Sequence, residues 1–296
     1  MLKKMLMCFC LFAYMLGVSA GTVGVVKDSK KGDVAVDNLT RAMALLDNTI
    51  DKCFKGSDLH MCDLYHLGNG RQEGTADVWP YTAAMEAVNG VMEALQTLKG
   101  NCPELYAKNM ERYKCLMARL FDNLDYYKGT YTLTSYTQTK EWSVYGVHRS
   151  NTKGTAQVEG IENVYDDQMW LVRELVRAYR NTGEKRYLVE AEYLAYYVID
   201  GWDCTLDADG HENGGITWGP GYNSKHSCSN APIISPLVWL SQIYKDSKDK
   251  TVWRYVAADG KRKSKKISKH DLYLMFAEKV YEWQKRKLMN EKTGCY

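Results

Sequence analysis

Residues 164–170 read VYDDQMW and open a segment with helical periodicity that runs to about Arg180. The adjacent acids Asp166 and Asp167 lie in its first turn, framed by Tyr165 and Trp170. Carboxylates paired beside aromatic rings are usual in sites that cut or hold a sugar. Asp is also favoured at a helix start, where it caps the backbone and faces the positive end of the helix dipole. The stretch by itself leaves both interpretations open.

A helical wheel of this segment predicts burial on more than one side, as in a layered helical assembly, because apolar residues cover a wide arc. The remaining narrow face carries three arginines: Arg173, Arg177 and Arg180. Asp166 falls on this arginine face and Asp167 near its edge, so the wheel fits a solvent-facing cap as well as a site. Trp170 shares the polar face, and a plain solvated surface rarely carries a Trp, which favours a site.

Outside this segment, apolar residues recur at helical spacing in six further stretches. They cover about 35–55, 75–99, 103–124, 184–202, 230–244 and 270–289. No strand–helix–strand alternation and no helical repeat signature is visible. The pattern therefore predicts an all-α protein built of helical hairpins.

Two long stretches interrupt the helices, at 128–163 and 202–230, and we expect both loops on one face. Structureless segments of that length in a compact domain are usually functional. Alternation of Thr with apolar residues around 131–136 is compatible with short strands. The Lys- and Arg-rich patch at 261–269 lacks interleaved aromatic residues and is expected to be a solvated loop or short hairpin.

The chain has 296 residues, of which 45% are hydrophobic, and a formal net charge of +3. These values predict one large domain and do not suggest a nucleic-acid binder. Residues 1–20 have the pattern of a signal peptide: two lysines, a short apolar run and small residues before Gly21. No cysteine lies directly after the expected cleavage point, so a lipoprotein signal is not indicated. We therefore predict a secreted or periplasmic protein, spanning 21–296, without a membrane span.

Seven of the nine cysteines lie beyond the predicted signal peptide, so at least one is unpaired if the others form disulfides. Cys53, His60, Cys62 and His66 are close in sequence, but their spacing matches no metal-binding template. No metal or cofactor is expected.

Four groups of residues resemble glycoside hydrolase family 76, the endo-α-1,6-mannanases. VYDDQMW at 164–170 is similar to the Asp-Asp signature of that family. GGITW at 214–218 resembles its Gly-Gly-Ile-Trp-Trp segment, with Thr217 replacing the first Trp. KHSCSN at 225–230 matches its Lys-x-x-x-Ser-Asn run, and VWP at 78–80 lies where the family has an aromatic pair. The resemblance extends from about residue 35 to the last residue.

The resemblance implies an (α/α)6 toroid, with six inner helices wrapped by six outer ones, and a substrate groove at one end. It also implies a retaining mechanism on α-1,6-linked mannan, polysaccharide or oligosaccharide, in which Asp166 is the nucleophile and Asp167 the acid/base. Such a mechanism needs carboxyl groups about 5–5.5 Å apart. Residues implied to frame the sugars are Trp79, Tyr165, Trp170 and Trp218. Residues implied to hydrogen-bond sugar hydroxyls are Lys225, Ser229 and Asn230; Trp79 as a core residue and Asn230 as only a helix cap stay open.

Seven expected helices are fewer than the twelve of the complete toroid, so the sequence is expected to be C-terminally truncated relative to the family. Two other functions stay open. One is a non-catalytic glycan-binding protein that uses the same groove. The other is a different α/α-toroid enzyme, such as a lyase, for which Tyr145, His148 and Arg149 offer a base and a cation. A lyase would leave the Asp pair without a role.

Overall fold

The computed structural model describes residues 31–296, and the predicted signal peptide lies outside them. Seven helices occupy the described residues, each close to a predicted stretch. They are α2 (Lys31–Cys53), α3 (Val78–Leu98), α4 (Pro103–Leu124), α5 (Tyr165–Thr182), α6 (Lys185–Asp200), α7 (Ala231–Ile243) and α8 (Lys269–Lys287). No helix within 31–296 combines the length and apolar character needed to cross a membrane.

Local sequence chemistry sets several helix ends. Pro103 occupies the first turn of α4, where its missing N–H has no helical partner in any case. Gly183 ends α5 with a left-handed φ of 77°, a conformation that glycine adopts without a side-chain clash. Ser268 caps α8 by accepting a hydrogen bond from the backbone N–H of Asp271. Pro236 lies inside α7, which begins at Ala231.

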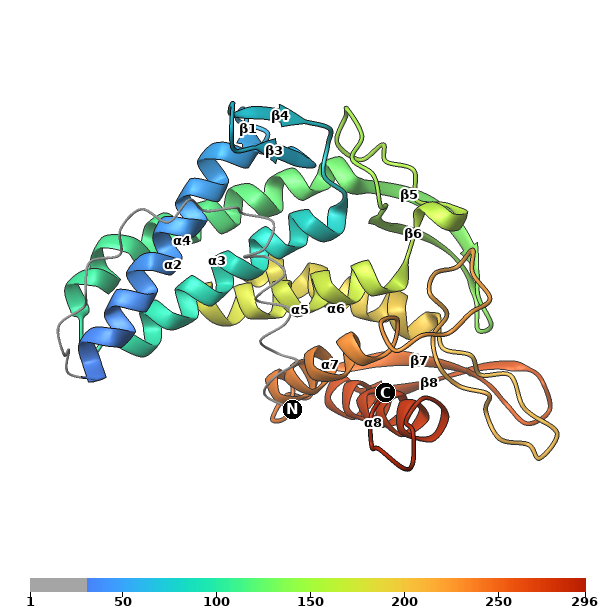
Figure 1. Ribbon diagram of the computed structural model, residues 1–296. Coiled ribbons are helices and arrows are strands. Elements are labelled where there is room, and N and C mark those ends of the chain that lie inside the picture. The colour runs from blue at the N-terminus through green and yellow to red at the C-terminus, as the bar shows by residue number, and fades with distance from the viewer. Residues whose placement is uncertain (1–30) are drawn as a thin grey trace.

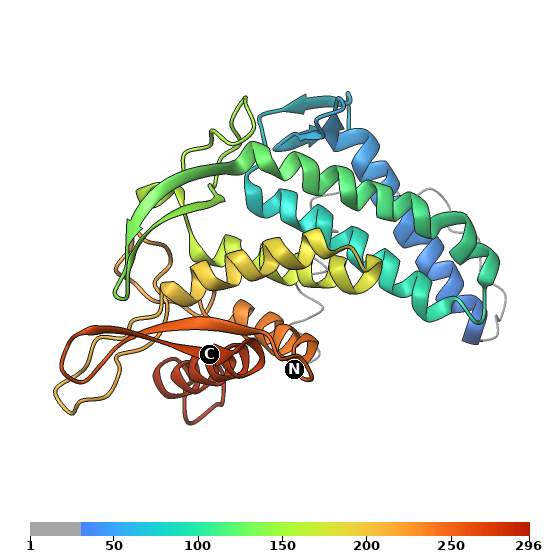
Figure 2. The same ribbon diagram turned by 180° about the vertical axis from the view of Figure 1, so that it is seen from behind.

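The helices form two layers (Figures 1 and 2). The inner row consists of α3, α5 and α7, and α5 contacts both of the others. Each of these helices packs against the next helix in the chain: α3 against α4, α5 against α6, and α7 against α8. Helix α2 packs on α3, and Asp47 of α2 pairs with Arg112 of α4. This double layer of helical hairpins is the arrangement of an α/α toroid, as predicted.

Two of the three arginines on this face of α5, Arg173 and Arg177, are turned towards α3, whereas Arg180 near the end of the helix is exposed. Arg173 pairs with Glu86 of α3 at 2.9 Å, and Arg177 pairs with Glu93 at 2.7 Å. Glu174, whose side chain is almost completely buried, accepts from Arg177 and from Asn89. The solvent-facing alternative is therefore wrong for Arg173 and Arg177, because their ion pairs with α3 bury charged groups that a helical wheel would assign to the surface.

Within residues 31–296, four two-stranded antiparallel hairpins lie between the helices. They are β1 (Phe54–Lys55) with β2 (His60–Met61), β3 (Leu64–His66) with β4 (Arg71–Glu73), β5 (Lys128–Thr134) with β6 (Thr139–Tyr145), and β7 (Lys250–Val256) with β8 (Arg262–Ser268). The expected strand near 131–136 is part of β5, and the basic patch forms β8, which confirms the hairpin interpretation. Both larger hairpins project on the side where α5 begins (Figure 1).

Candidate active site

The segments that precede the three inner helices meet at one end of the molecule. Ahead of α3, the N–H of Val78 donates to the carbonyl of Val147 at 2.9 Å. At the start of α5, the N–H of Tyr165 donates to the carbonyl of Trp218 at 2.7 Å. Because α3, α5 and α7 begin at this end, the loops 146–164 and 201–230 lie on one face, as expected.

Asp166 and Asp167 lie in the first turn of α5, whose N-cap is Val164, so neither acid caps the helix. Oδ1 of Asp166 accepts from the backbone N–H of Asp167 at 3.0 Å, and Oδ2 accepts from Trp218 Nε1 at 3.1 Å. The carboxylate of Asp167 accepts no hydrogen bond from the described residues, and the residue is 8% exposed. Two neighbouring acids thus have different environments.

This difference separates their protonation states. Burial raises the pKa of Asp167 to about 8, and the nearby charges of Asp166 and Asp77 add to the effect. Burial also raises the pKa of Asp166, but hydrogen bonds from Trp218 and from the Asp167 N–H oppose it. Because a hydrogen-bonded carboxylate ionises before an unbonded buried one, the pair holds one proton near neutral pH, on Asp167.

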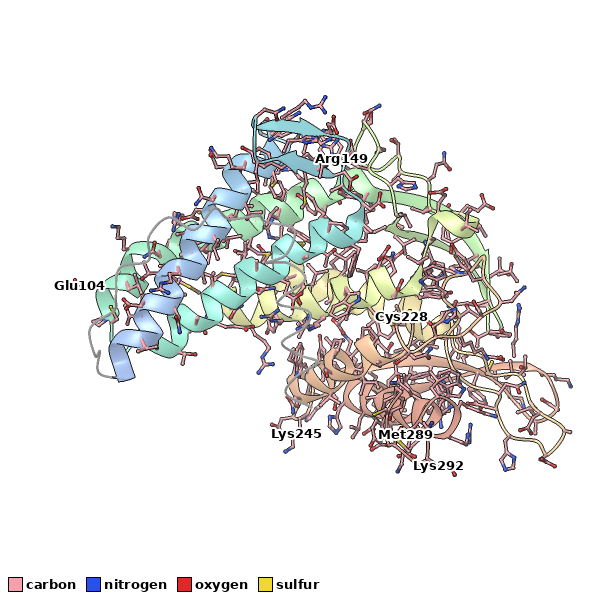
Figure 3. All side chains as sticks on the ribbon, viewed as in Figure 1. Glu104, Arg149, Cys228, Lys245, Met289 and Lys292 are labelled. Atoms are coloured by element: carbon pink, nitrogen blue, oxygen red, sulfur yellow. The ribbon has the colours of Figure 1, made fainter. Side chains whose placement is uncertain are left out.

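Four further side chains, which the motifs did not indicate, lie beside the pair or are linked to it through Asp77. Asp77 Oδ1 lies 2.7 Å from His148 Nδ1, and His148 Nε2 lies 3.6 Å from Glu162. Cys228 lies near Asp166, on the loop before α7 (Figure 3). Burial, with the charge of Asp166, raises the pKa of the Cys228 thiol, so the thiol is neutral beside the carboxylate.

Three tryptophans stay accessible around or near the pair. Trp218 is 38% exposed, and its ring packs against Tyr222 with centroids 4.8 Å apart. Trp79, in the first turn of α3, is 59% exposed. Trp170 is partly exposed, with the guanidinium of Arg173 5.1 Å from the ring centroid. Open aromatic faces beside a carboxyl pair are suited to pyranose rings, which present apolar C–H faces.

The sequence model of Glycosyl hydrolase family 76 matches residues 81–256, well over half of the chain and including both acids and Trp218. This chain belongs to glycosyl hydrolase family 76. The resemblance seen in the four motifs is thereby confirmed at the level of the family. A comparison with curated proteins found no match.

Solved structures share the fold at low sequence identity. A family 76 mannosidase from Bacteroides thetaiotaomicron VPI-5482 is 20% identical with a TM-score of 0.55; 86% of this chain matches 55% of that one. A family 76 α-mannanase from Bacteroides thetaiotaomicron is 15% identical with a TM-score of 0.54, over 89% and 58% of the two chains. A D-mannose isomerase is 13% identical with a TM-score of 0.51, over 90% and 60%. The chain thus spans little more than half the length of these structures.

Within this family 76 chain, three predicted sugar contacts are wrong because the side chains are buried. Tyr165 is 3% exposed and packs on Tyr197, with ring centroids 5.0 Å apart. Ser229 and Asn230 have no exposed surface. A polar residue next to a sugar-binding motif was expected to face the sugar, whereas these residues face the protein interior.

The polar residues of the 225–230 run instead shape the loop that carries Trp218. Asn230 Oδ1 accepts from the N–H of Ile216 at 2.8 Å, while its Nδ2 donates to the Ile216 carbonyl at 3.0 Å. Ser229 Oγ donates to the same carbonyl at 3.1 Å. Asn230 is the N-cap residue of α7, as the alternative had it, but its side chain makes no cap hydrogen bond and binds the Ile216 backbone instead.

Lys225 also stabilises the loop that carries Trp218. Its ammonium donates to Asp203 and to the carbonyl of Gly214, both at 2.6 Å. These bonds tie the two sides of the 201–230 loop together. Two of the three N–H donors of Lys225 thus have protein partners, which leaves one for a sugar hydroxyl. The hydrogen bond from Lys225 to a sugar stays a prediction.

Gly215 is required by its surroundings, and this yields a testable prediction. Its φ is +78°, and a Cβ there would overlap the ring of Trp283 in α8. Gly210 has a φ of +81° with nothing within 4 Å of its Cβ position. Gly215→Ala is expected to lower the free energy of unfolding by more than about 3 kcal/mol, against about 1–2 kcal/mol for Gly210→Ala, which meets only the backbone strain. Urea denaturation of both variants checks this, and equal losses would contradict the steric argument.

The residues considered for a lyase do not form a site together. Tyr145 is buried and donates to Glu190, while Arg149 pairs with Asp58 at 2.6 Å and lies over Tyr126. Only His148 reaches the region of the Asp pair, through Asp77. Between residues 31 and 296, no three His, Cys, Asp or Glu side chains cluster in a way that fits a metal ion.

Proposed function

We propose that this chain is a retaining glycoside hydrolase that cleaves α-1,6-linked mannose chains. The observation that carries the proposal is the asymmetry of the adjacent acids: Asp166 is held by hydrogen bonds as an anion, and Asp167 is buried and protonated. A retaining glycosidase needs one carboxylate to attack and one carboxylic acid to protonate the leaving group.

The substrate part of the proposal rests on the motifs that resemble the endo-α-1,6-mannanases. Two solved structures with this fold are described as a mannosidase and an α-mannanase, which supports a mannose-containing substrate. The fold does not select the reaction by itself, since a D-mannose isomerase shares it. Export of the chain, expected from residues 1–20, is proposed with it, because a polymeric mannan is met outside the cell.

The first half of the reaction follows from the two environments. An Asp166 carboxylate oxygen attacks the anomeric carbon as Asp167 delivers its proton to the glycosidic oxygen, so the glycosidic bond breaks and a mannosyl–Asp166 ester forms. The N–H of Trp218 orients the Asp166 carboxylate for this attack. Burial of Asp167 keeps its proton available at neutral pH.

In the second half, Asp167 is an anion and accepts a proton from water as the water oxygen attacks the anomeric carbon. The ester bond breaks, Asp166 leaves as a carboxylate, and Asp167 regains its proton. Two inversions give net retention. Exposed rings such as Trp218 and Trp79 hold the mannose units on either side of the reacting bond.

Proton NMR of a fresh digest of linear α-1,6-mannan tests the proposal. The first reducing end released is expected in the α configuration, with the β anomer growing in only by mutarotation. A β-1,4-mannan serves as the control and is expected to stay intact. A β product at the first time point would overturn retention, and binding of α-1,6-mannan without cleavage would identify a glycan-binding protein instead.

A further inference from the structure

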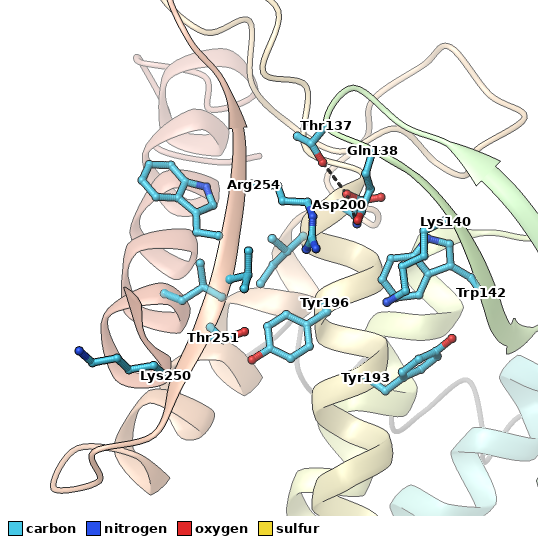
Figure 4. A pocket seen from close by; sticks show the side chains of 14 residues that line it. Thr137, Gln138, Lys140, Trp142, Tyr193, Tyr196, Asp200, Lys250, Thr251 and Arg254 are labelled. Atoms are coloured by element: carbon cyan, nitrogen blue, oxygen red, sulfur yellow. Dashed lines mark hydrogen bonds between the residues drawn. The ribbon is translucent and has the colours of Figure 1, made fainter. Parts of the chain in front are cut away.

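A second cavity lies on the other side of α6 from the Asp pair. Its volume is about 420 Å³, and its walls are the β5–β6 hairpin, α6 and strand β7 (Figure 4). Tyr196 and Asp200 of α6 line it, whereas Tyr197 faces α5 and packs on Tyr165. Its size is within the range of small-molecule sites. Nothing in the proposed hydrolysis uses this cavity.

Buried polar atoms without partners gather in its walls. Of five such side-chain atoms in residues 31–296, three belong to residues that line this cavity: Trp142 Nε1, Tyr196 Oη and Asp200 Oδ2. Trp142 is 1% exposed and Asp200 is 6% exposed. Buried polar atoms are nearly always hydrogen-bonded, to protein or to ordered water, so these three mark a place where a polar molecule would complete hydrogen bonds.

In Asp200, only one of the two carboxylate oxygens lacks a hydrogen-bond partner. Its Oδ1 accepts from Thr137 Oγ1 at 2.7 Å and from Gln138 Nε2 at 3.0 Å, both in the turn between β5 and β6. These bonds fix the carboxylate and leave Oδ2 as a fixed, unused acceptor. Together with the Trp142 donor and the Tyr196 hydroxyl, it offers the mixed donors and acceptors that sugar hydroxyls require.

Two cations of the same cavity also lack partners. Neither Lys140 nor Arg254 forms an ion pair with an acid among the described residues, and Lys140 Nζ lies 3.6 Å from the centroid of the Trp142 ring. Burial, with the charge of Arg254, lowers the pKa of Lys140, and the charge of Asp200 opposes this shift. In Figure 4 the Arg254 side chain points into the cavity, whereas Lys250 runs away from the other labelled residues. Two cations that form no ion pair favour an anionic ligand, while the Asp200 carboxylate in the same cavity favours the hydroxyl groups of that ligand.

The cavity is also held in shape by a contact between the two hairpins. Arg262 of β8 donates from Nε to the carbonyl of Tyr136 at 3.0 Å and from Nη2 to the carbonyl of Ser135 at 2.9 Å. These bonds join the β7–β8 hairpin to the turn of the β5–β6 hairpin. A site that is formed before the ligand arrives loses less conformational entropy on binding.

We propose that this cavity binds a small anionic sugar, with its hydroxyls on Asp200, Tyr196 and Trp142 and its phosphate or carboxylate group between Lys140 and Arg254. The Asp200 carboxylate receives hydroxyl donors, and the two cations receive the anionic group. The site does not depend on the proposed hydrolysis, so each is tested separately.

Isothermal titration calorimetry of the whole chain with four probes tests the proposal: mannose 6-phosphate, glucuronate, mannose and inorganic phosphate. We expect mannose 6-phosphate or glucuronate to bind at least about tenfold more tightly than mannose and than phosphate, because only they use both halves of the site. The stronger of the two identifies the anionic group. Equal binding of mannose would overturn the anionic part, and equal binding of phosphate would overturn the sugar part.

Variants assign the binding to this cavity. Arg254→Gln and Lys140→Gln are each expected to weaken the anionic sugar at least about tenfold, while Lys250→Gln leaves its affinity unchanged. Hydrolysis of mannan is expected to be the same in all three. Unchanged affinity in both Arg254→Gln and Lys140→Gln, with melting temperatures like that of the unsubstituted chain, would place the sugar elsewhere and overturn the proposal.

Discussion

Asp166→Asn is expected to abolish mannan hydrolysis, with a fall in kcat on the order of 10⁴-fold or more. The amide cannot form the mannosyl ester, because its oxygen is a poor nucleophile and its nitrogen has no free lone pair. The two N–H groups of Asp167 and Trp218 donate to different oxygens of Asp166, and the amide keeps one oxygen, so one of these two bonds is lost. Losing one hydrogen bond in the first turn of α5 costs about 1 kcal/mol, so the fold is expected to persist, and mannan binding with it.

Initial rates on α-1,6-mannan measure the loss of turnover. Calorimetric titration of the same preparation with an α-1,6-mannotetraose measures whether binding is kept. Asp209→Asn is the matched control: Asp209 is exposed in the 201–230 loop, and its substitution changes the same charge. We expect that control to keep full activity. Turnover by Asp166→Asn within tenfold of the unsubstituted chain would remove Asp166 from the reaction.

Much of the helical fold could be predicted because the signals are local. Apolar spacing and punctuating residues such as Pro103 act within a few turns, so the helix positions agree with the structure to within a few residues. The polar strip of α5 could not be placed by the same means. Whether Arg177 meets water or Glu93 depends on a helix more than eighty residues away in the chain.

The active site shows the same division. The place of Asp166 and Asp167 in the first turn of a helix follows from the sequence, but their unlike environments do not. Asp167 is buried by distant segments, and one of the charges beside it is Asp77, ninety residues away. Asn230 was expected on the sugar because it is polar and near a motif. Its amide instead satisfies the backbone of Ile216, a need that only the folded loop creates.

Asp167→Asn is expected to change both the pH dependence of stability and the pH dependence of catalysis. The pKa of Asp167 is about 8 in the folded chain and about 4 in an unfolded one. Between these values the folded state holds a proton that the unfolded state has released, so the stability of the unsubstituted chain falls as pH rises through this window. The amide never ionises. The variant should therefore gain stability relative to the unsubstituted chain from pH 4 to 8, with no further gain above.

Thermal melts from pH 4 to 9 measure that difference, with Asp209→Asn as the exposed reference that is expected to follow the unsubstituted curve. Parallel curves for Asp167→Asn and the unsubstituted chain would show that Asp167 is ionised in the folded state. That result would also remove the acid from the proposed mechanism, because a carboxylate has no proton to give to the glycosidic oxygen.

Catalysis supplies the second readout of the same proton. The unsubstituted chain is expected to lose kcat/KM as pH rises through about 8, where Asp167 ionises. Asp77→Asn removes one of the charges that raise this pKa, so the alkaline limb should move to lower pH. Asp167→Asn should lack the limb and should still release 4-nitrophenol from an aryl α-mannoside, because that leaving group departs without a proton, while mannan stays uncut. If the alkaline limb of kcat/KM stays at the same pH in Asp77→Asn and in Asp167→Asn, it reports another titrating group. The assignment of acid and nucleophile within the pair would then be wrong.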